Sequence, residues 1–172
     1  MRKAFLRAPL DFTRISSRFN PNRRHPITGK VRAHKGIDYA APTGTPIYAA
    51  GDGRIEFAGR KGGYGNAVVI NHGRNITTLY GHMSRFGKSA RNGRAVRQGE
   101  VIGFVGSTGA STGPHLHYEY RIRGAHKNPE SIPLPNTEIA AAYVSEFRGE
   151  AETTLAQLEI ASAVGTGTLA SL

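Results

Sequence analysis

Two histidines stand one residue apart, His115 and His117, in the segment "GPHLHYEYRI". Apolar and polar residues alternate along this segment, which is the pattern of a β-strand with one buried face and one polar face. On such a strand both imidazoles point to the same side, about 7 Å apart at a rise of ~3.3 Å per residue. On a helix they would point in nearly opposite directions. The strand arrangement lets one imidazole bind a metal ion while the other stands beside a metal-bound water.

A second pair of ligand-type residues, His34 and Asp38, lies upstream in "AHKGIDYAAPTGTP". Residues four apart share a face in an extended segment and are also neighbours on a helix, but Gly36 and the following "APTGTP" favour the extended form. With one imidazole from a distant strand, this pair completes three ligands. Three protein ligands with an open fourth position are typical of catalytic zinc, which lowers the pKa of its bound water to about 7 and polarises a carbonyl.

The remaining composition narrows the chemistry. The chain has no cysteine, which excludes disulfides and thiolate ligands and leaves histidines and carboxylates as the strong metal ligands. No HExxH sequence is present, so a glutamate base of that type is not predicted. We interpret His72 as a structural or groove-wall residue, and His25 and His126 as loop residues.

Short apolar runs bounded by glycine or proline must position these side chains. The 22 glycines and nine prolines indicate many turns, and no convincing helix separates the runs. We therefore predict a mainly β fold, a small antiparallel β-sheet or sandwich-like domain of six or seven short strands, preceded by an irregular segment 1–33. The Asp52-Gly53 pair between "TPIYAA" and "RIEFAG" predicts a hairpin at that point. The other expected strands are "AVVINH", "ITTLYGHM", "GEVIGFVG" and "HLHYEYRI".

The character of the chain changes after Pro135. Residues 136–172 are rich in Ala, Glu and Leu, with apolar residues at helical spacing. The sequence therefore predicts a domain over 1–135, with its core at about 15–130, and a short α-helical C-terminal extension over 136–172.

The net charge of +11 is unevenly distributed. Of the 23 basic residues 22 precede residue 136, together with 7 of the 12 acidic ones, so residues 1–135 carry +15. Such a surface favours a polyanionic partner: nucleic acid, an anionic membrane or a cell-wall polymer. The sequence contains no recognition-helix pattern or stacked-aromatic RNA motif, so nucleic acid is not predicted. No run of 18 apolar residues is present, so no membrane span is predicted either.

Several motifs together resemble a known family. "HKGIDYAAPTGTPIYAAGDG", "GYGNAVVINHG", "TLYGHMS" and "VRQGEVIGFVGSTGASTGPHLHYE" follow, in order, the pattern of lysostaphin/LytM-type zinc metallopeptidases. The resemblance covers residues 15–130 and implies a small β-sheet domain that holds Zn2+ in a groove and cleaves peptide cross-links of bacterial peptidoglycan. The upstream "RISSRFNPNRRHPITGKVRAHKGIDYAAP" is similar to the Gram-negative envelope type, which implies D-alanyl–diaminopimelate bridges as the substrate.

The resemblance assigns roles residue by residue. It implies His34, Asp38 and His117 as zinc ligands, His115 facing the zinc-bound water, and His82 of "YGHMS" as a further catalytic histidine. We expect His115 to be the general base and His82 to stabilise the oxyanion or protonate the leaving amine, although the sequence leaves these two roles interchangeable.

Three further residues are weaker candidates for substrate contacts. Tyr64 and Asn66 in "GGYGN" either line the groove or form a tight hairpin. Asn20 is either a substrate contact or an inhibitory metal ligand.

A second function stays open: a non-catalytic cell-wall-binding or amidase-activating module of the same fold, against which the intact ligand set argues. A peptidoglycan substrate implies a periplasmic or cell-envelope location, yet the N-terminus lacks the apolar core of a signal peptide. We therefore expect a longer gene product with a targeting or regulatory region before residue 1, and an envelope protein as a possible partner of the C-terminal helices.

Overall fold

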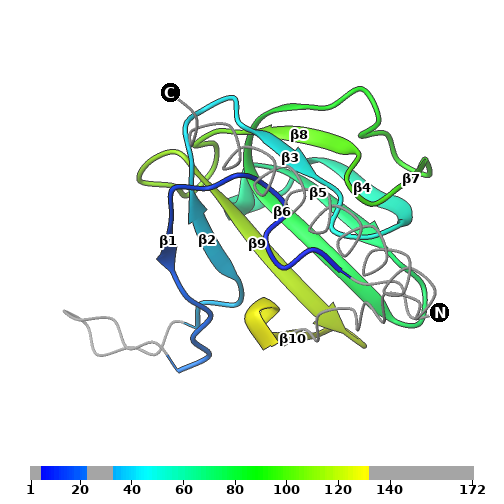
Figure 1. The fold of residues 1–172 in the computed structure, drawn as a ribbon, viewed down its shortest axis with the longest axis horizontal. Coiled ribbons are helices and arrows are strands. Elements are labelled where there is room, and N and C mark those ends of the chain that lie inside the picture. Colours follow the sequence, from blue (N-terminus) through cyan, green and yellow to red (C-terminus); the bar gives the residue numbers. More distant parts are fainter. Residues whose placement is uncertain (1–4, 23–32, 132–172) are drawn as a thin grey trace, which may run out of the picture. The chain divides into compact units, whose positions relative to one another are not determined.

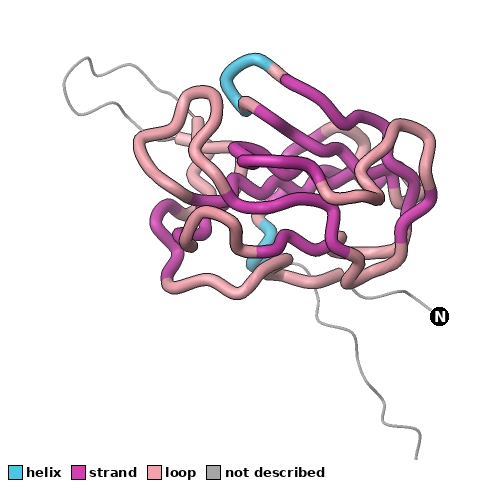
Figure 2. Tube along the Cα trace, turned by 90° about the horizontal axis from the view of Figure 1, so that it is seen from above, coloured by secondary structure: helices cyan, strands magenta, loops and turns pink. Residues whose placement is uncertain are grey.

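A single antiparallel β-sheet dominates the computed structural model, which describes residues 5–22 and 33–131. Figure 2 shows strands along most of the described chain and helix only in two short turns. The mainly β prediction is confirmed, whereas the predicted helices of 136–172 lie outside the described residues. The elements are β1 (Arg14–Ser17), β2 (Ile37–Ala40), β3 (Pro46–Tyr48), β4 (Gly53–Arg60), η1 (Gly62–Tyr64), β5 (Asn66–Asn71), β6 (Ile76–Phe86), β7 (Ala95–Val96), β8 (Val101–Val105), β9 (His115–Ile122), β10 (Ala125–Lys127) and η2 (Pro129–Ser131).

The strand with the two histidines is central in the sheet. The strand order is β1-β2-β9-β6-β5-β4-β7, with β10 paired to β9, and with β8 paired to both β6 and β3. Figure 1 shows β9 running between β2 and β6. Every described strand pair is antiparallel. No helix among the described residues is long and apolar enough to cross a membrane.

The predicted alternation of β9 is what separates core from site. Leu116 and Tyr118 are fully buried on one face, and the Tyr118 ring packs against Tyr80 with the ring centroids 5.4 Å apart. Burying a large apolar side chain contributes roughly 1.5–3 kcal/mol relative to leaving it exposed. The same core contains Ile37, Ile47, Ile55, Val68, Ile70, Met83, Ile102 and Val105.

Strand β6 changes one of its two partners at His82. Before it, Tyr80 pairs with Tyr118 of β9; after it, Met83 pairs with Val105 of β8. Strand β5 pairs with β6 on both sides of His82. The register shifts at this point, and His82 has φ = +61°. A β-bulge bends its strand and redirects a side chain, and a non-glycine residue in this conformation persists only where the surroundings hold it. The bulge therefore sets the direction of the His82 side chain.

Three local expectations were wrong. Strand β3 pairs with β8 rather than with β4, so the Asp52-Gly53 turn does not close a hairpin. The reason is that the Asp52 carboxylate accepts a hydrogen bond from the Gln98 backbone amide (2.8 Å), which ties the turn to the β7–β8 connection. Strand β1 lies within the segment expected to be irregular, and His126 lies on β10 rather than in a loop.

Candidate metal centre and catalytic groove

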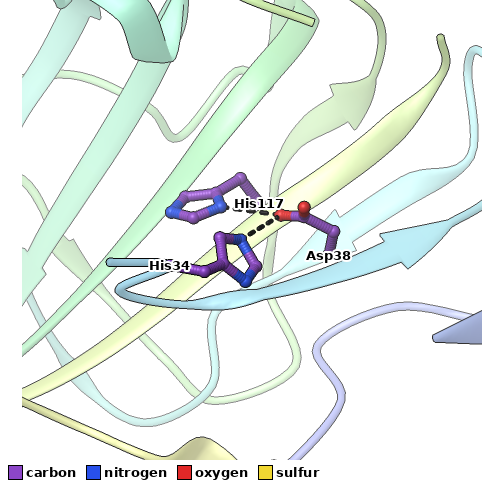
Figure 3. A group of neighbouring side chains, drawn as sticks. All are labelled: His34, Asp38 and His117. Atoms are coloured by element: carbon purple, nitrogen blue, oxygen red, sulfur yellow. Dashed lines mark hydrogen bonds and ion pairs between the residues drawn. The ribbon is translucent and has the colours of Figure 1, made fainter. Parts of the chain in front are cut away.

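Three side chains from two neighbouring segments converge on one point. The nearest ligand atoms of His34, Asp38 and His117 all lie within 4.8 Å of one another (Figure 3). Asp38 on β2 is directly opposite His117 on β9 in the strand register. His34 precedes β2, where its backbone forms a bridge with Asn20. Sequence spacing and cross-strand pairing together bring the predicted ligand set into one place.

Outer hydrogen bonds orient both histidines. His34 donates from Nδ1 to the Arg18 carbonyl (2.8 Å), and His117 donates from Nε2 to Glu119 Oε1 (3.1 Å). The opposite nitrogens therefore face Asp38 Oδ1, at 3.1 Å from His34 Nε2 and 2.7 Å from His117 Nδ1. Metal-binding histidines commonly have this second partner, which selects the tautomer and the ring orientation.

The acidic and basic groups of the cluster stabilise each other in their charged forms. Burial alone would raise the pKa of Asp38, but the imidazoles of His117 and His34 hold this pKa well below its ordinary value. Burial alone would lower the pKa of His117, but Asp38 and Glu119 raise it to about 9. The metal-free cluster is therefore a place where a positive charge is strongly favoured.

The cluster fits zinc by its own geometry. His34 Nε2 is buried and makes no hydrogen bond, although it lies 3.1 Å from Asp38 Oδ1. Two imidazole nitrogens and one carboxylate oxygen form an acceptable three-ligand zinc set with an open fourth position. Gly36 lies against this set, since a Cβ there would stand 2.8 Å from His117 Cε1 and 2.5 Å from the Tyr118 carbonyl oxygen. The glycine of "HKGID" is thus required by close packing on a ligand.

Two further imidazoles lie beside the metal cluster. The ring centroids of His82 and His115 are 4.6 Å apart. His82 donates from Nδ1 to the Thr108 carbonyl (2.7 Å), and His115 donates from Nδ1 to the Gly113 carbonyl (2.8 Å). In the neutral form both rings therefore have their lone pair on Nε2. Burial lowers the pKa of His82, which favours this neutral form.

All five side chains line one groove of about 610 Å³. Its walls include the η1 turn and the loop before β9, which are locked together by the hydrogen bond from the Ala110 N–H to the Gly63 carbonyl (2.8 Å). Their backbones are so close at Gly65 and Gly109 that a Cβ on either would stand 2.4 Å from backbone atoms of the other segment. Asn66 takes part in this lock: its backbone N–H donates to Thr108 Oγ1 and its side chain to the Met83 carbonyl. The other residues that line the groove are Ala33, Lys35, Gly63, Tyr64, Ala110, Ser111, Thr112 and Glu119.

The three weaker candidates for substrate contacts differ in whether they line the groove. Tyr64 lines the groove, and its hydroxyl donates to Glu119 Oε1 (2.8 Å). The structure does not bring Asn20 or Asn66 into the groove lining: Asn20 Oδ1 accepts the Asn22 backbone N–H instead. Contact of any of the three with a substrate stays a prediction.

A buried polar network behind His117 was not predicted as part of the site. Glu119 is fully buried and also accepts hydrogen bonds from Arg121, while His126 Nε2 lies 3.1 Å from its Oε2. Burial alone would raise the pKa of Glu119, but its contacts with His117 and Arg121 lower this pKa to about 2. The signal was present in the sequence, because the period-2 pattern of β9 puts Glu119 and Arg121 on the histidine face.

The comparison with family models decides the classification. Residues 32–129 match the model of peptidase family M23. The chain belongs to peptidase family M23. It is 48% identical over 160 residues to the peptidoglycan DD-endopeptidase ShyC of Vibrio cholerae, an alignment that covers 92% of this chain and 36% of that protein. The chain thus spans about a third of the length of this curated relative.

Solved structures agree with this classification. A zinc-containing peptidase from Vibrio cholerae superposes with a TM-score of 0.72 at 39% identity, covering 77% of this chain and 41% of that one. The catalytic domain of lysostaphin from Staphylococcus simulans gives 0.58 at 29% identity, covering 68% and 89%. The predicted resemblance to lysostaphin-type peptidases is confirmed, and zinc is the cofactor of this M23 domain.

The close packing of Gly36 gives a first prediction. Replacing it (Gly36→Ala) forces the His117 ring or the β9 backbone to move, so we expect the Kd for zinc to rise at least about tenfold. Titration with a fluorescent zinc chelator measures this change. Gly63→Ala is the matched control, because a Cβ there meets only Ala110 Cβ at 3.8 Å. Unchanged zinc affinity in Gly36→Ala would contradict the packing argument.

The raised pKa of His117 gives a second prediction. Because this pKa is about 9 without metal, His117 carries an extra proton at neutral pH that zinc must displace from Nδ1. Zinc affinity therefore increases as pH rises and levels off above about 9. Isothermal titration in buffers of different ionisation enthalpy should show release of about one proton near pH 7. Release of none would mean that His117 is already neutral.

Proposed function

We propose that this chain is a zinc-dependent endopeptidase that hydrolyses peptide cross-links of bacterial peptidoglycan. The observation that carries the proposal is the convergence, in one open groove, of a three-ligand metal cluster with two imidazoles outside the ligand set. Metal ligands alone would suit a structural site, whereas extra proton-accepting groups beside them suit hydrolysis. The name of the relative ShyC, a peptidoglycan DD-endopeptidase, supports the substrate class.

The residues divide into binding and proton-transfer roles. His34, Asp38 and His117 hold the ion, which when bound polarises the scissile carbonyl and acidifies a water. His115 Nε2, which bears the lone pair, lies 3.8 Å from Asp38 Oδ1, at the edge of the cluster. We assign His115 as the base that removes a proton from the attacking water.

The displaced proton must reach the nitrogen of the leaving amine when the C–N bond breaks. His82 stands beside His115 and presents its own Nε2 once Nδ1 is held by the Thr108 carbonyl. Once Nε2 has taken up this proton, His82 can donate to the oxyanion or return the proton to the leaving amine, and we assign it these roles in that protonated form. Both imidazoles have the same tautomer, held by a backbone carbonyl. We therefore divide the roles of His115 and His82 by where each ring lies relative to the metal cluster.

The finer specificity is proposed to be the D-alanyl–diaminopimelate bridge. In that bridge the carbon next to the scissile amide nitrogen bears a free carboxylate. Lys35 is exposed and lines the groove next to the ligand His34, and we propose that its positive charge attracts such a carboxylate. A substrate of this kind lies outside the cytoplasm, and we therefore propose a periplasmic or cell-envelope location. The excess of basic residues before residue 136 also favours an anionic wall polymer.

A muropeptide digest tests the reaction. Zinc-loaded protein should convert purified cross-linked muropeptide dimers into monomers, as seen by chromatography and mass spectrometry, and a chelator should stop the conversion. His34→Ala should lose both zinc and activity. His115→Ala should keep zinc but lose about 10²- to 10⁴-fold in kcat.

The alternative function predicts a different outcome. A non-catalytic wall-binding or amidase-activating module would leave every dimer intact at full zinc occupancy, while binding peptidoglycan or stimulating an amidase. Retention of full activity by His34→Ala would also exclude the proposed role of the metal cluster.

The proposed role of Lys35 predicts a charge-dependent specificity. Lys35→Gln should lower kcat/KM on diaminopimelate-linked dimers by about fivefold, the value of one partly exposed ion pair. Dimers in which that carboxylate is amidated should be cleaved equally by the two proteins. Lys88→Gln is a matched control, because Lys88 is exposed and lies outside the groove lining. Equal loss on both dimers would assign Lys35 a role other than carboxylate recognition.

A further inference from the structure

The buried carboxylate of Glu119 has more partners than a structural ion pair needs. Its side chain is 0% exposed. Oε1 accepts hydrogen bonds from Tyr64 (2.8 Å) and His117 (3.1 Å). Oε2 accepts from Arg121 Nε (2.8 Å) and lies 3.1 Å from His126 Nε2. A charge in such a place is costly unless its partners are fixed, so the surrounding groups must be held in a defined geometry.

The two oxygens face different parts of the molecule. Oε2 faces the cationic side chain of Arg121, which neutralises the carboxylate. Oε1 faces the metal cluster through His117 and the groove wall through Tyr64, whose ring centroid is 5.5 Å from that of His117. With its charge balanced by Arg121, the carboxylate can use Oε1 to accept hydrogen bonds from His117 and Tyr64.

The His117 ring lies between two carboxylates. Its Nδ1 is 2.7 Å from Asp38 Oδ1, and its Nε2 is 3.1 Å from Glu119 Oε1. A neutral imidazole has one N–H, and either carboxylate can accept it. If the N–H is on Nδ1, the lone pair points away from the cluster and the ring cannot bind the ion there. If it is on Nε2, Nδ1 is available as the ligand.

We propose that Glu119 is a positioning residue for the metal centre: by accepting the Nε2–H of His117 it holds the tautomer that binds zinc through Nδ1, and through Tyr64 it fixes the adjacent groove wall to the same strand. Outer carboxylates of this kind typically change metal affinity by about 10- to 100-fold. The inference rests on the zinc site of the proposed function but not on peptidase activity, because zinc binding is measured without substrate. A protein that binds zinc as expected but cleaves nothing would leave it standing.

Glu119→Gln tests the proposal, since it removes the charge and keeps the size. We expect its Kd for zinc to rise about 10- to 100-fold. Thr78→Val is the matched control: Thr78 is also buried on the sheet and hydrogen-bonded, to His72 and Tyr80, but away from the cluster. It should lose stability and keep the wild-type Kd. A wild-type Kd in a folded Glu119→Gln protein would overturn the proposal.

A spectroscopic measurement separates positioning from simple stabilisation. In zinc-loaded protein with ¹⁵N-labelled histidine, the Nε2–H of His117 should give a slowly exchanging, strongly downfield proton resonance. Glu119→Gln should move that resonance upfield and speed its exchange. The wild-type resonance is informative even if the variant fails to fold, because zinc bound through Nε2, or an Nε2 without its proton, would equally overturn the proposal.

Tyr64→Phe separates the two parts of the proposal. It removes one donor to Glu119 and leaves the contact between Glu119 and His117. Zinc affinity should change less than about threefold, while exchange of the backbone amides of η1 should accelerate. Unchanged η1 exchange would remove the groove-wall part.

Discussion

The antiparallel pairing of β2 with β9 is the constraint on which the rest of the site depends. It places Asp38 opposite His117 and, in the adjacent position, Ile37 opposite Tyr118. A slip of one residue would turn the side chains of one strand to the other face of the sheet. Ile37 and Tyr118 are fully buried, so such a slip would expose them and push histidines into the core. The hydrophobic core therefore enforces the register that assembles the metal cluster.

Charge is layered across the polar face of the same strands. Asp38, His117, Glu119 and Arg121 form a continuous series of contacts in which acidic and basic groups alternate. Each carboxylate is stabilised in its charged form by the basic groups beside it, and therefore the pKa values of Asp38 and Glu119 are lowered in spite of their burial. A metal ion that binds at the Asp38 end of the series therefore meets a carboxylate that is already negatively charged.

Departures from regular β-structure supply the catalytic side of the groove. The bulge at His82 separates the part of β6 that pairs with β9 from the part that pairs with β8, while β5 pairs with β6 on both sides of it. His82 thereby donates to the Thr108 carbonyl and lies beside His115. A regular strand would alternate its side chains along one ladder and would not redirect one of them in this way.

Residue types and short-range periodicity were enough to predict much of this protein. The alternation in "HLHYEYRI" defined a strand with both histidines on the polar face, and the lack of cysteine left histidines and a carboxylate as metal ligands. Those inferences hold because side-chain direction in a strand depends only on local geometry.

The predicted Asp52-Gly53 hairpin is wrong for the opposite reason, because a hydrogen bond from Gln98, 46 residues away in sequence, outweighs the local turn preference. Arg18, His126 and the bulge at His82 likewise owe their places to partners distant in the chain. The sequence by itself indicated His34, Asp38 and the two histidines of β9 as candidate metal ligands, and it predicted that both β9 histidines stand on the polar face of their strand. Only the tertiary structure decided which nitrogen of each histidine faces the cluster, because that choice is made by hydrogen-bond acceptors on other segments.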